Sequence, residues 1–386
     1  MDFDVVIVGG GLVGASLACA LRDLRIAIVD AAAAAPPPDA RGFDSRVYAL
    51  SPGNAAFLRA IGAWDRIPAS ALTPVRGMQV WGDDGVSAIG FDAWDSGVAE
   101  LAWIVEDRVL QAALRAELQA RPGIARYAPS QCKALHVEPV RAMVALADGA
   151  SLGAKLVVGA DGAESRVRDE AGIAARREAY PQHAVVANFA CGKPHGGVAR
   201  QWFQGGPVLA LLPLPGEHVS MVWSTHDAEA ARLAALDAQS LCVEVERACG
   251  GVLGGFSLVT PARTFALQRL DAQVSICQRV ALVGDAAHVV HPLAGQGANL
   301  GFQDARVLAD VLAAREPGRD PGDRGLLRRY ERARAEAILT MGATVHGLYR
   351  LFDDGGTFAR RSRNAGLKLV DRMAVVKNLL IRQAMQ

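Results

Sequence analysis

Three glycines near the N-terminus have the spacing of a nucleotide-binding turn. Gly9, Gly11 and Gly14 form a Gly-x-Gly-x-x-Gly motif, which follows the apolar run Val5–Val8 and precedes a helix expected from Leu12. Glycines here permit a tight turn, close approach of the backbone to a pyrophosphate, and close packing of helix on strand. The helix N-terminus adds free N–H groups and a positive dipole end. The motif predicts a dinucleotide site, and the alternative is a purely structural glycine turn.

An acidic residue follows at the distance that this interpretation requires. Asp30 ends the second apolar run, Ile26–Asp30, and lies 21 residues after Gly9. A carboxylate at the end of this strand can accept hydrogen bonds from both ribose hydroxyls of a nucleotide. Strand, helix, strand and acid together favour dinucleotide binding, but they do not distinguish NAD from FAD.

A second glycine-rich segment favours a flavin. Gly284 and Asp285 directly follow the apolar run Val280–Val283, and residues 295–299 open a later helix. A carboxylate at the end of a strand can hold the polyol chain of a flavin. A helix N-terminus can stabilise the anionic N1–C2=O edge of the reduced ring. The alternative is a glycine-rich strand-to-helix turn with a capping aspartate.

Two further pairs of residues have simple structural interpretations. Asp161 and Ser165 can cap the helix that follows the segment Gly159–Arg168. His288 and His291 lie three residues apart with no third metal ligand nearby in the sequence. This pattern indicates turn residues near a flavin rather than a metal site.

The elements that must position these residues indicate two kinds of sheet. Val5–Val8, Leu156–Val158 and Val280–Val283 have the uninterrupted apolar character of buried parallel strands, so one layer is assembled from separated segments. Runs separated by Gly and Pro turns predict a second, antiparallel sheet. These runs are Ala184–Ala190, Ala199–Phe203, Val208–Leu212 and Val219–Trp223.

We therefore predict an α/β protein with a Rossmann-like FAD-binding domain built from discontinuous segments, an inserted antiparallel-sheet substrate domain, and C-terminal helices. The predicted boundaries are 1–75, 100–180 and 278–345 for the FAD-binding domain, 76–99 and 181–277 for the substrate domain, and 346–386 for the C-terminal helical segment.

The composition indicates which kinds of partner the chain could bind. The 386 residues include 41 Lys and Arg against 40 Asp and Glu, a net charge of +1 that gives no general attraction to nucleic acid. A hydrophobic fraction of 51% excludes an extended disordered chain. Mean hydropathy is +0.17, so peripheral contact with a membrane stays open.

The cysteines and the N-terminus predict a cytoplasmic protein. The six cysteines include no Cys-x-x-Cys pair, which favours buried thiols in a reducing compartment. The uncharged stretch Val5–Leu21 imitates a signal peptide, but it follows an acidic rather than a basic segment and contains four glycines. It is also shorter than the roughly 20 apolar residues of a membrane span.

In this order and at these distances, the motifs resemble those of the single-component FAD-dependent aromatic hydroxylases of the para-hydroxybenzoate hydroxylase type. Within that group the sequence is most similar to the ubiquinone-biosynthesis hydroxylases. The resemblance covers about residues 3–350. It is carried by Asp44–Ser51, Val105–Gln111, Gly206–Leu214 with Ser220–Trp223, and Gly284–Gln303.

The resemblance implies which residues contact the cofactor. The adenosine diphosphate half of FAD would contact Gly9, Gly11, Gly14 and Asp30, with Arg46 and Arg108 at the flavin side and pyrophosphate. Asp161 would belong to a motif shared between FAD and the pyridine nucleotide. The ribityl chain and flavin ring would contact Asp285, Pro292, Gln296, Gly297, Ala298 and Asn299. Two residues depart from the family pattern, since Asp30 replaces a commoner Glu and Ala298 replaces a larger aliphatic residue that would narrow the pocket.

The resemblance also implies the reaction. It is hydroxylation of the aromatic ring of a polyprenylated ubiquinone precursor with NAD(P)H and O2, through a flavin C4a-hydroperoxide. Such chemistry needs a dry cavity rather than an acid–base triad, and we assign no catalytic residue. With one Rossmann-type motif, NAD(P)H is expected to bind transiently. The alternatives are a flavin hydroxylase or reductase of another aromatic or isoprenoid metabolite, and a weakly active structural flavoprotein of a ubiquinone-biosynthesis complex.

Two apolar regions are candidate contact surfaces. Val208–Leu214 and Val219–Trp223, with Trp202 and Phe203, could wall the substrate cavity, and ordinary sheet core is the alternative. Between Leu367 and Leu380, apolar residues approximate one helical face. That face could contact the inner face of a membrane, a ubiquinone-biosynthesis partner or a second copy of the chain, or it could pack on the core.

Overall fold

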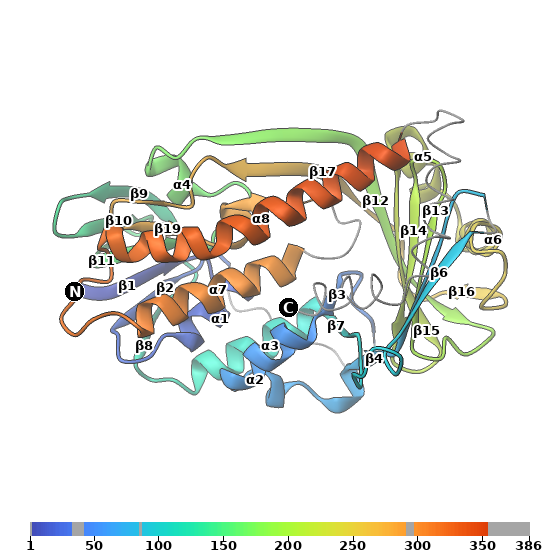
Figure 1. Ribbon diagram of the computed structural model, residues 1–386, viewed down its shortest axis with the longest axis horizontal. Coiled ribbons are helices and arrows are strands. Elements are labelled where there is room, and N and C mark those ends of the chain that lie inside the picture. The colour runs from blue at the N-terminus through green and yellow to red at the C-terminus, as the bar shows by residue number, and fades with distance from the viewer. Residues whose placement is uncertain (1, 33–41, 85–86, 291–296, 354–386) are drawn as a thin grey trace.

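The protein is described by a computed structural model that covers residues 2–32, 42–84, 87–290 and 297–353 (Figure 1). Four features predicted from the sequence lie outside these residues. They are His291, Pro292, Gln296 and the apolar face between Leu367 and Leu380.

The first sheet has eight strands in the described part of the chain. Its central strands are parallel, and the register pairs Val5 with both Leu156 and Ile26. Its order is β18 (Ile276–Cys277), β19 (Val280–Leu282), β11 (Ser151–Gly159), β1 (Asp2–Val8), β2 (Ile26–Val29) and β8 (Ile124–Tyr127). The hairpin of β9 (Cys132–Val137) and β10 (Ala142–Leu146) extends β11. The parallel layer is thus assembled from separated segments, as predicted.

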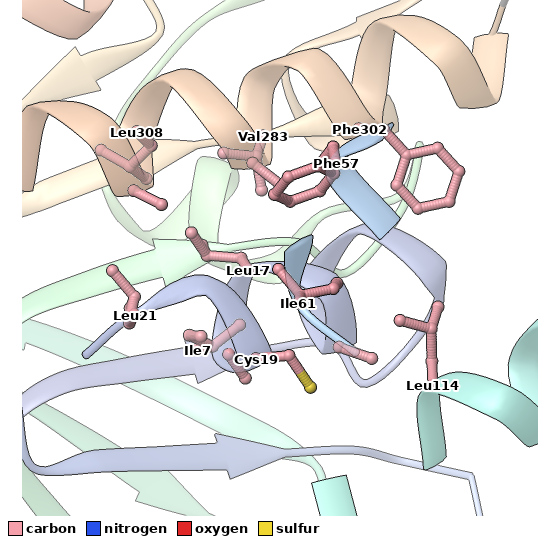
Figure 2. Packing of buried hydrophobic residues seen from close by; sticks show 14 of the residues in the cluster. Ile7, Leu17, Cys19, Leu21, Phe57, Ile61, Leu114, Val283, Phe302 and Leu308 are labelled. Carbon is pink, nitrogen blue, oxygen red and sulfur yellow. The ribbon is translucent and has the colours of Figure 1, made fainter. Parts of the chain in front are cut away.

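Helices cover one face of this sheet and enclose its core. They are α1 (Leu12–Ala20), α2 (Pro52–Ala60), α3 (Asp107–Gln119), α7 (Gly297–Ala313) and α8 (Arg324–Asp353). Figure 2 shows Ile7 of β1 packed beneath Leu17 of α1, with Phe57, Leu114 and Phe302 around them. Short elements complete this region: η1 (Trp64–Arg66), η2 (Ala69–Ala71), α4 (Arg166–Glu170) and η3 (Gly284–Ala286).

The first helix is shorter than the sequence predicts. The apolar pattern predicts a helix from Leu12 to Leu24, but α1 ends at Ala20. Leu21 adopts an extended backbone, and Asp23 has a left-handed φ of 57°. The last four residues therefore form the turn that leads into β2.

The second sheet has nine strands within the described residues and is mainly antiparallel. Its order is β20 (His288–Val289), β17 (Arg263–Ala272), β12 (Ala175–Cys191), β15 (His218–His226), β14 (Val208–Leu214), β13 (Val198–Phe203), β5 (Gly77–Trp81) and β6 (Ala88–Asp92), with β16 (Phe256–Leu258) beside β12. Helices α5 (Asp227–Ala234) and α6 (Ala238–Ala248) pack on its outer face. This is the antiparallel sheet that the turn pattern predicts.

Long strands connect the two sheets. Figure 1 shows that β12 and β17 span the distance between the first sheet and the second, and the two strands run in opposite directions. β12 begins at Ala175, before the predicted domain boundary at residue 181, because its first residues already pair with the end of β17. A small third sheet of β3 (Val47–Leu50), β7 (Ala102–Glu106) and β4 (Thr73–Val75) completes the fold. The predicted α/β class is confirmed.

None of the helices whose residues are described has both the length and the apolar character that a membrane span requires.

Candidate active site

A cavity of about 830 Å³ lies where the three sheets meet. Gly11 at the start of α1 and Asp285 in η3 line it from the first sheet, and Tyr48 lines it from the third. Ala210 of β14 lies on the wall that the second sheet contributes, and Asn299 lines the cavity at the start of α7. Segments far apart in the sequence therefore meet around one space.

The glycine turn at this cavity is tightly packed on one side and open on the other. A Cβ atom on Gly9 would overlap the carbonyl group of Ala160, and one on Gly14 would overlap the carbonyl oxygen of Gly9. Gly11, by contrast, has no atom within 4 Å of the position a Cβ would take. Gly9 and Gly14 therefore allow close packing of strand and helix, while Gly11 leaves room beside the cavity.

Two predicted site aspartates lie beside this turn. The carboxylate of Asp30 lies against Gly10 and accepts a hydrogen bond of 3.1 Å from the backbone N–H of Ala32. Asp161 accepts hydrogen bonds from the Ser165 hydroxyl at 2.5 Å and the Val167 N–H at 3.1 Å. Ser165 caps α4, as the simple interpretation predicts, and Asp161 supports that cap.

The two predicted arginines have different positions. Arg46 lines the cavity, and its guanidinium lies 5.3 Å from the ring centre of Phe265. Arg108, at the start of α3, is not among the described residues that line the cavity. Its Nε donates to Glu106 at 2.9 Å, and its backbone N–H donates to Asp44 at 3.3 Å. The structure thus brings Arg46 to the cavity and pairs Arg108 with Glu106, next in sequence to the lining residue Asp107.

The second glycine-rich segment supplies a carboxylate that is exposed to the cavity. The protein around Asp285 limits the hydration of its carboxylate and so raises its pKa, while the positive charges of His288 and Arg46 oppose that rise. Gly297, Ala298 and Asn299 line the cavity as well. This segment therefore brings a carboxylate and the first turn of α7 to the same space.

Asn299 also connects three elements. Its Oδ1 accepts hydrogen bonds from the backbone N–H of Ser51 at 3.1 Å and from the side chain of Asn54 at 2.9 Å. Its Nδ2 donates to the carbonyl oxygen of Ala49 at 2.8 Å. Asn299 therefore fixes the start of α7 to β3 and α2 at the edge of the cavity.

A buried ionic network behind Asp285 was not found from the sequence. The Asp304 carboxylate accepts from the Gly284 N–H at 2.8 Å, from His288 Nε2 at 2.7 Å and from Arg334 Nε at 2.6 Å. Asp304, His288 and Arg334 are 0%, 4% and 3% exposed. Asp304 directly follows the stretch Gly284–Gln303, but nothing in the sequence marks Arg334 as its partner. The sequence analysis predicts that His288 is a turn residue near a flavin. In the structure His288 is a buried residue that pairs with Asp304.

Charge pairing determines the protonation of this network. Burial lowers the pKa of His288, but the Asp304 carboxylate outweighs burial and raises it above the ordinary value. Burial likewise raises the pKa of Asp304, while His288 and Arg334 lower it overall. The favoured state is an ionised aspartate between two cations.

Strand alternation corrects the predicted cavity wall. Successive residues of a strand point to opposite faces, so only alternate residues can line the cavity. Val208, Ala210, Leu212 and Val222 do so. Trp202, Leu209, Leu211, Met221 and Trp223 belong to the core cluster on the other face, which α5 and α6 cover. About half of the predicted wall is therefore sheet core.

The residues present fit FAD. Helix α1 begins at Leu12, its N-cap residue is Gly11, and it has no capping side chain and no acidic residue in its first turn, so its N–H groups can receive a pyrophosphate. The open space at Gly11 and the Asp30 carboxylate suit the phosphate and ribose of the nucleotide half. Asp285 and the start of α7 supply polar groups further along the cavity.

Comparisons with known proteins agree with this geometry. Residues 2–341 match the protein family described as "FAD binding domain". The chain is 36% identical over 384 residues to ubiquinone hydroxylase UbiL of Rhodospirillum rubrum. This match covers 99% of this chain and 89% of that protein. It is 34% identical over 388 residues to the 3-demethoxyubiquinol 3-hydroxylase of Escherichia coli, covering 99% and 98%.

A solved structure shows the same similarity. The crystal structure of pqsL, a probable FAD-dependent monooxygenase from Pseudomonas aeruginosa, matches with a TM-score of 0.78 and 25% identity. The match covers 95% of this chain and 99% of that one. The family match at residues 2–341 spans every described residue that lines the cavity.

Proposed function

The chain belongs to the FAD-binding domain family and is an FAD-dependent aromatic hydroxylase, and we propose that it hydroxylates the ring of a polyprenylated ubiquinone precursor. The resemblance found in the sequence is thereby confirmed at the level of the family. The observation that carries the proposal is one cavity with FAD-compatible groups on one side and an apolar sheet wall on the other.

The chain's own residues would first bind the cofactor. The N–H groups at Gly11 and the first turn of α1 would receive the pyrophosphate, and Asp30 would accept from the ribose. Asp285 would accept from the ribityl hydroxyls, and Arg46 would contact the flavin side. When bound, FAD supplies the reducing equivalents that activate O2 for transfer of one oxygen atom to the ring.

The sheet wall would bind and orient the substrate. Its alternate apolar residues remove ring and tail surface from water, which stabilises binding by about 25 cal/mol per Å² of apolar surface. The same wall excludes water from the reacting atoms, and this protects the reaction from wasteful release of reduced oxygen. No side chain is assigned to acid–base catalysis.

The proposal includes three further interactions. NAD(P)H would bind transiently as the electron donor, because one Rossmann-type turn is present in the described chain and it serves FAD. The polyprenylated substrate would be taken from the inner face of a membrane, with the chain in the cytoplasm and in peripheral contact with the lipid. Partner proteins of ubiquinone biosynthesis, or a second copy of the chain, would bind elsewhere on the surface.

Oxygen incorporation tests the proposed reaction. The purified holoenzyme is incubated with NADH or NADPH, ¹⁸O2 and 2-geranylphenol, a phenol with a short isoprenoid tail. We expect phenol-stimulated NAD(P)H oxidation and a product that carries one ¹⁸O atom. A protein that remains colourless with added FAD would overturn the cofactor assignment, and a yellow protein that gives no labelled product would overturn the reaction.

A further inference from the structure

Two polar side chains interrupt the apolar wall of the cavity. Gln201 of β13 and Ser224 of β15 line the cavity and are 7% and 3% exposed. The other lining residues of the nine-stranded sheet are apolar: Met78, Phe91, Ala199, Val208, Ala210, Leu212, Val222 and Val289. None of the described lining residues that this sheet contributes is charged. The wall can therefore recognise neutral polar groups at two points.

Strand register places the two polar residues on either side of β14. Gln201 pairs with Ala210, Ala210 pairs with Val222, and Ser224 follows two residues later on β15. With strands about 4.8 Å apart and about 3.4 Å per residue along a strand, the Cα atoms of Gln201 and Ser224 are roughly 12 Å apart. The small side chain of Ala210 lies in the same row as Gln201 and leaves space above β14.

The chemistry of the two groups suits ring oxygens. A glutamine amide offers two donors and two acceptor lone pairs, and a serine hydroxyl offers one donor and two lone pairs. A glutamine amide has more hydrogen-bonding positions than one partner can occupy, so a ligand group that bonds to the amide or to the serine hydroxyl is favoured over one that cannot. Hydroxyl and methoxy oxygens of a neutral phenol meet this requirement.

We propose that Gln201 and Ser224 form the subsite that binds the oxygen substituents of the substrate ring, with the ring lying over Ala210. The two residues determine specificity and orient the ring, and this assignment rests on the proposed function. The subsite recognises the ring, while the surrounding apolar wall recognises the tail.

Two ligands that differ by one hydrogen-bond donor measure the contribution of the subsite to binding. Isothermal titration calorimetry on the FAD-bound protein measures the dissociation constants of 2-geranylphenol and of its methyl ether, which lacks the phenolic donor. The wild type should bind the phenol roughly 3- to 10-fold more tightly than the ether, as expected for one neutral hydrogen bond. Because the phenol has one oxygen, the variant that removes its partner, Gln201→Leu or Ser224→Ala, should lose this preference and bind the phenol more weakly by a similar factor.

Matched variants on exposed positions serve as controls. Gln79→Leu on β5 and Ser257→Ala on β16 change the same residue types at exposed sites and should keep the wild-type preference. Ser224→Ala removes one oxygen atom, so it provides the test if Gln201→Leu does not fold. If both subsite variants fold and keep the full preference for the phenol, the subsite assignment is wrong. In that case the proposed function still stands if the wild type gives the ¹⁸O-labelled product in the reaction above. A wild type that neither binds nor hydroxylates the phenol would overturn the proposed function itself.

Discussion

Asp304 is a fully buried carboxylate whose charge is compensated from three directions. It accepts hydrogen bonds from Gly284 of η3, His288 of β20 and Arg334 of α8. Removing a charge from water is costly, and the cost is offset only where partners are close and well oriented. Because Gly284 precedes Asp285, this compensation also fixes the turn that brings a carboxylate to the cavity.

The charge on His288 makes this stabilisation dependent on pH. The pKa of His288 is raised in the folded protein, so its contribution is fully present below the ordinary value of about 6.5 and is lost as the pH rises through the folded value. We expect His288→Gln to lower the free energy of unfolding by about 3 kcal/mol at pH 6 and by less at pH 9. Urea unfolding at both pH values measures the difference.

A histidine on an exposed position provides the comparison. His136→Gln on β9 should change the free energy of unfolding by less than about 0.5 kcal/mol. A loss for His288→Gln that grows from pH 6 to pH 9 would contradict the assigned charge state.

At the scale of elements, the glycines of the turn between β1 and α1 have two different roles, packing and ligand binding. Gly9 and Gly14 are needed because their neighbours leave no room for a Cβ, whereas Gly11 faces open space beside the cavity. The first role concerns packing of helix on strand, and the second concerns a ligand. A substitution at each position can therefore distinguish folding from cofactor binding.

We predict opposite phenotypes for Gly11→Ala and Gly14→Ala. The FAD-free Gly11→Ala protein should unfold within about 0.5 kcal/mol of the wild type, because its methyl group meets no atom, but should bind FAD at least roughly 10-fold more weakly. Gly14→Ala should lose about 3 kcal/mol or more through the clash with Gly9. Denaturant titration and FAD reconstitution measure the two effects, and normal FAD affinity in Gly11→Ala would place the pyrophosphate elsewhere.

Local patterns predicted most of these elements and the residues at their ends. The strand Val5–Val8, the glycine turn and Asp285 are all recognisable because their signal lies within a few neighbouring residues. The pairing of Asp304 with Arg334 is not, because their side chains meet only after α7 and α8 pack together. Which face of β14 lines the cavity is decided in the same way, because α5 and α6 cover the other face. The continuous apolar run therefore could not show that Ala210 lines the cavity and that Leu209 lies in the core.

At the scale of the whole molecule, the cavity lies between two walls, and each wall packs on a core of its own. The first sheet holds the glycine turn and Asp285 through the core in Figure 2, while the second sheet is supported on its other face by α5 and α6. A bulky residue added to one wall should therefore leave the opposite wall intact. This arrangement allows cofactor and substrate binding to be separated by mutation.

Ala210→Trp and Ala298→Trp test that separation. Ala210 lies on the sheet wall and Ala298 on the α7 side of the same cavity. Tryptophan at position 210 should fill the space for the ring, so 2-geranylphenol binding should fall at least roughly 100-fold while FAD affinity stays within about 2-fold. Tryptophan at position 298 should instead weaken FAD binding. Val243→Trp, at an exposed position of α6, controls for the added side chain and should leave both affinities unchanged. If Ala210→Trp releases FAD and phenol together, the two ligands do not occupy separate sides of the cavity, because one bulky side chain on the sheet wall would then reach both.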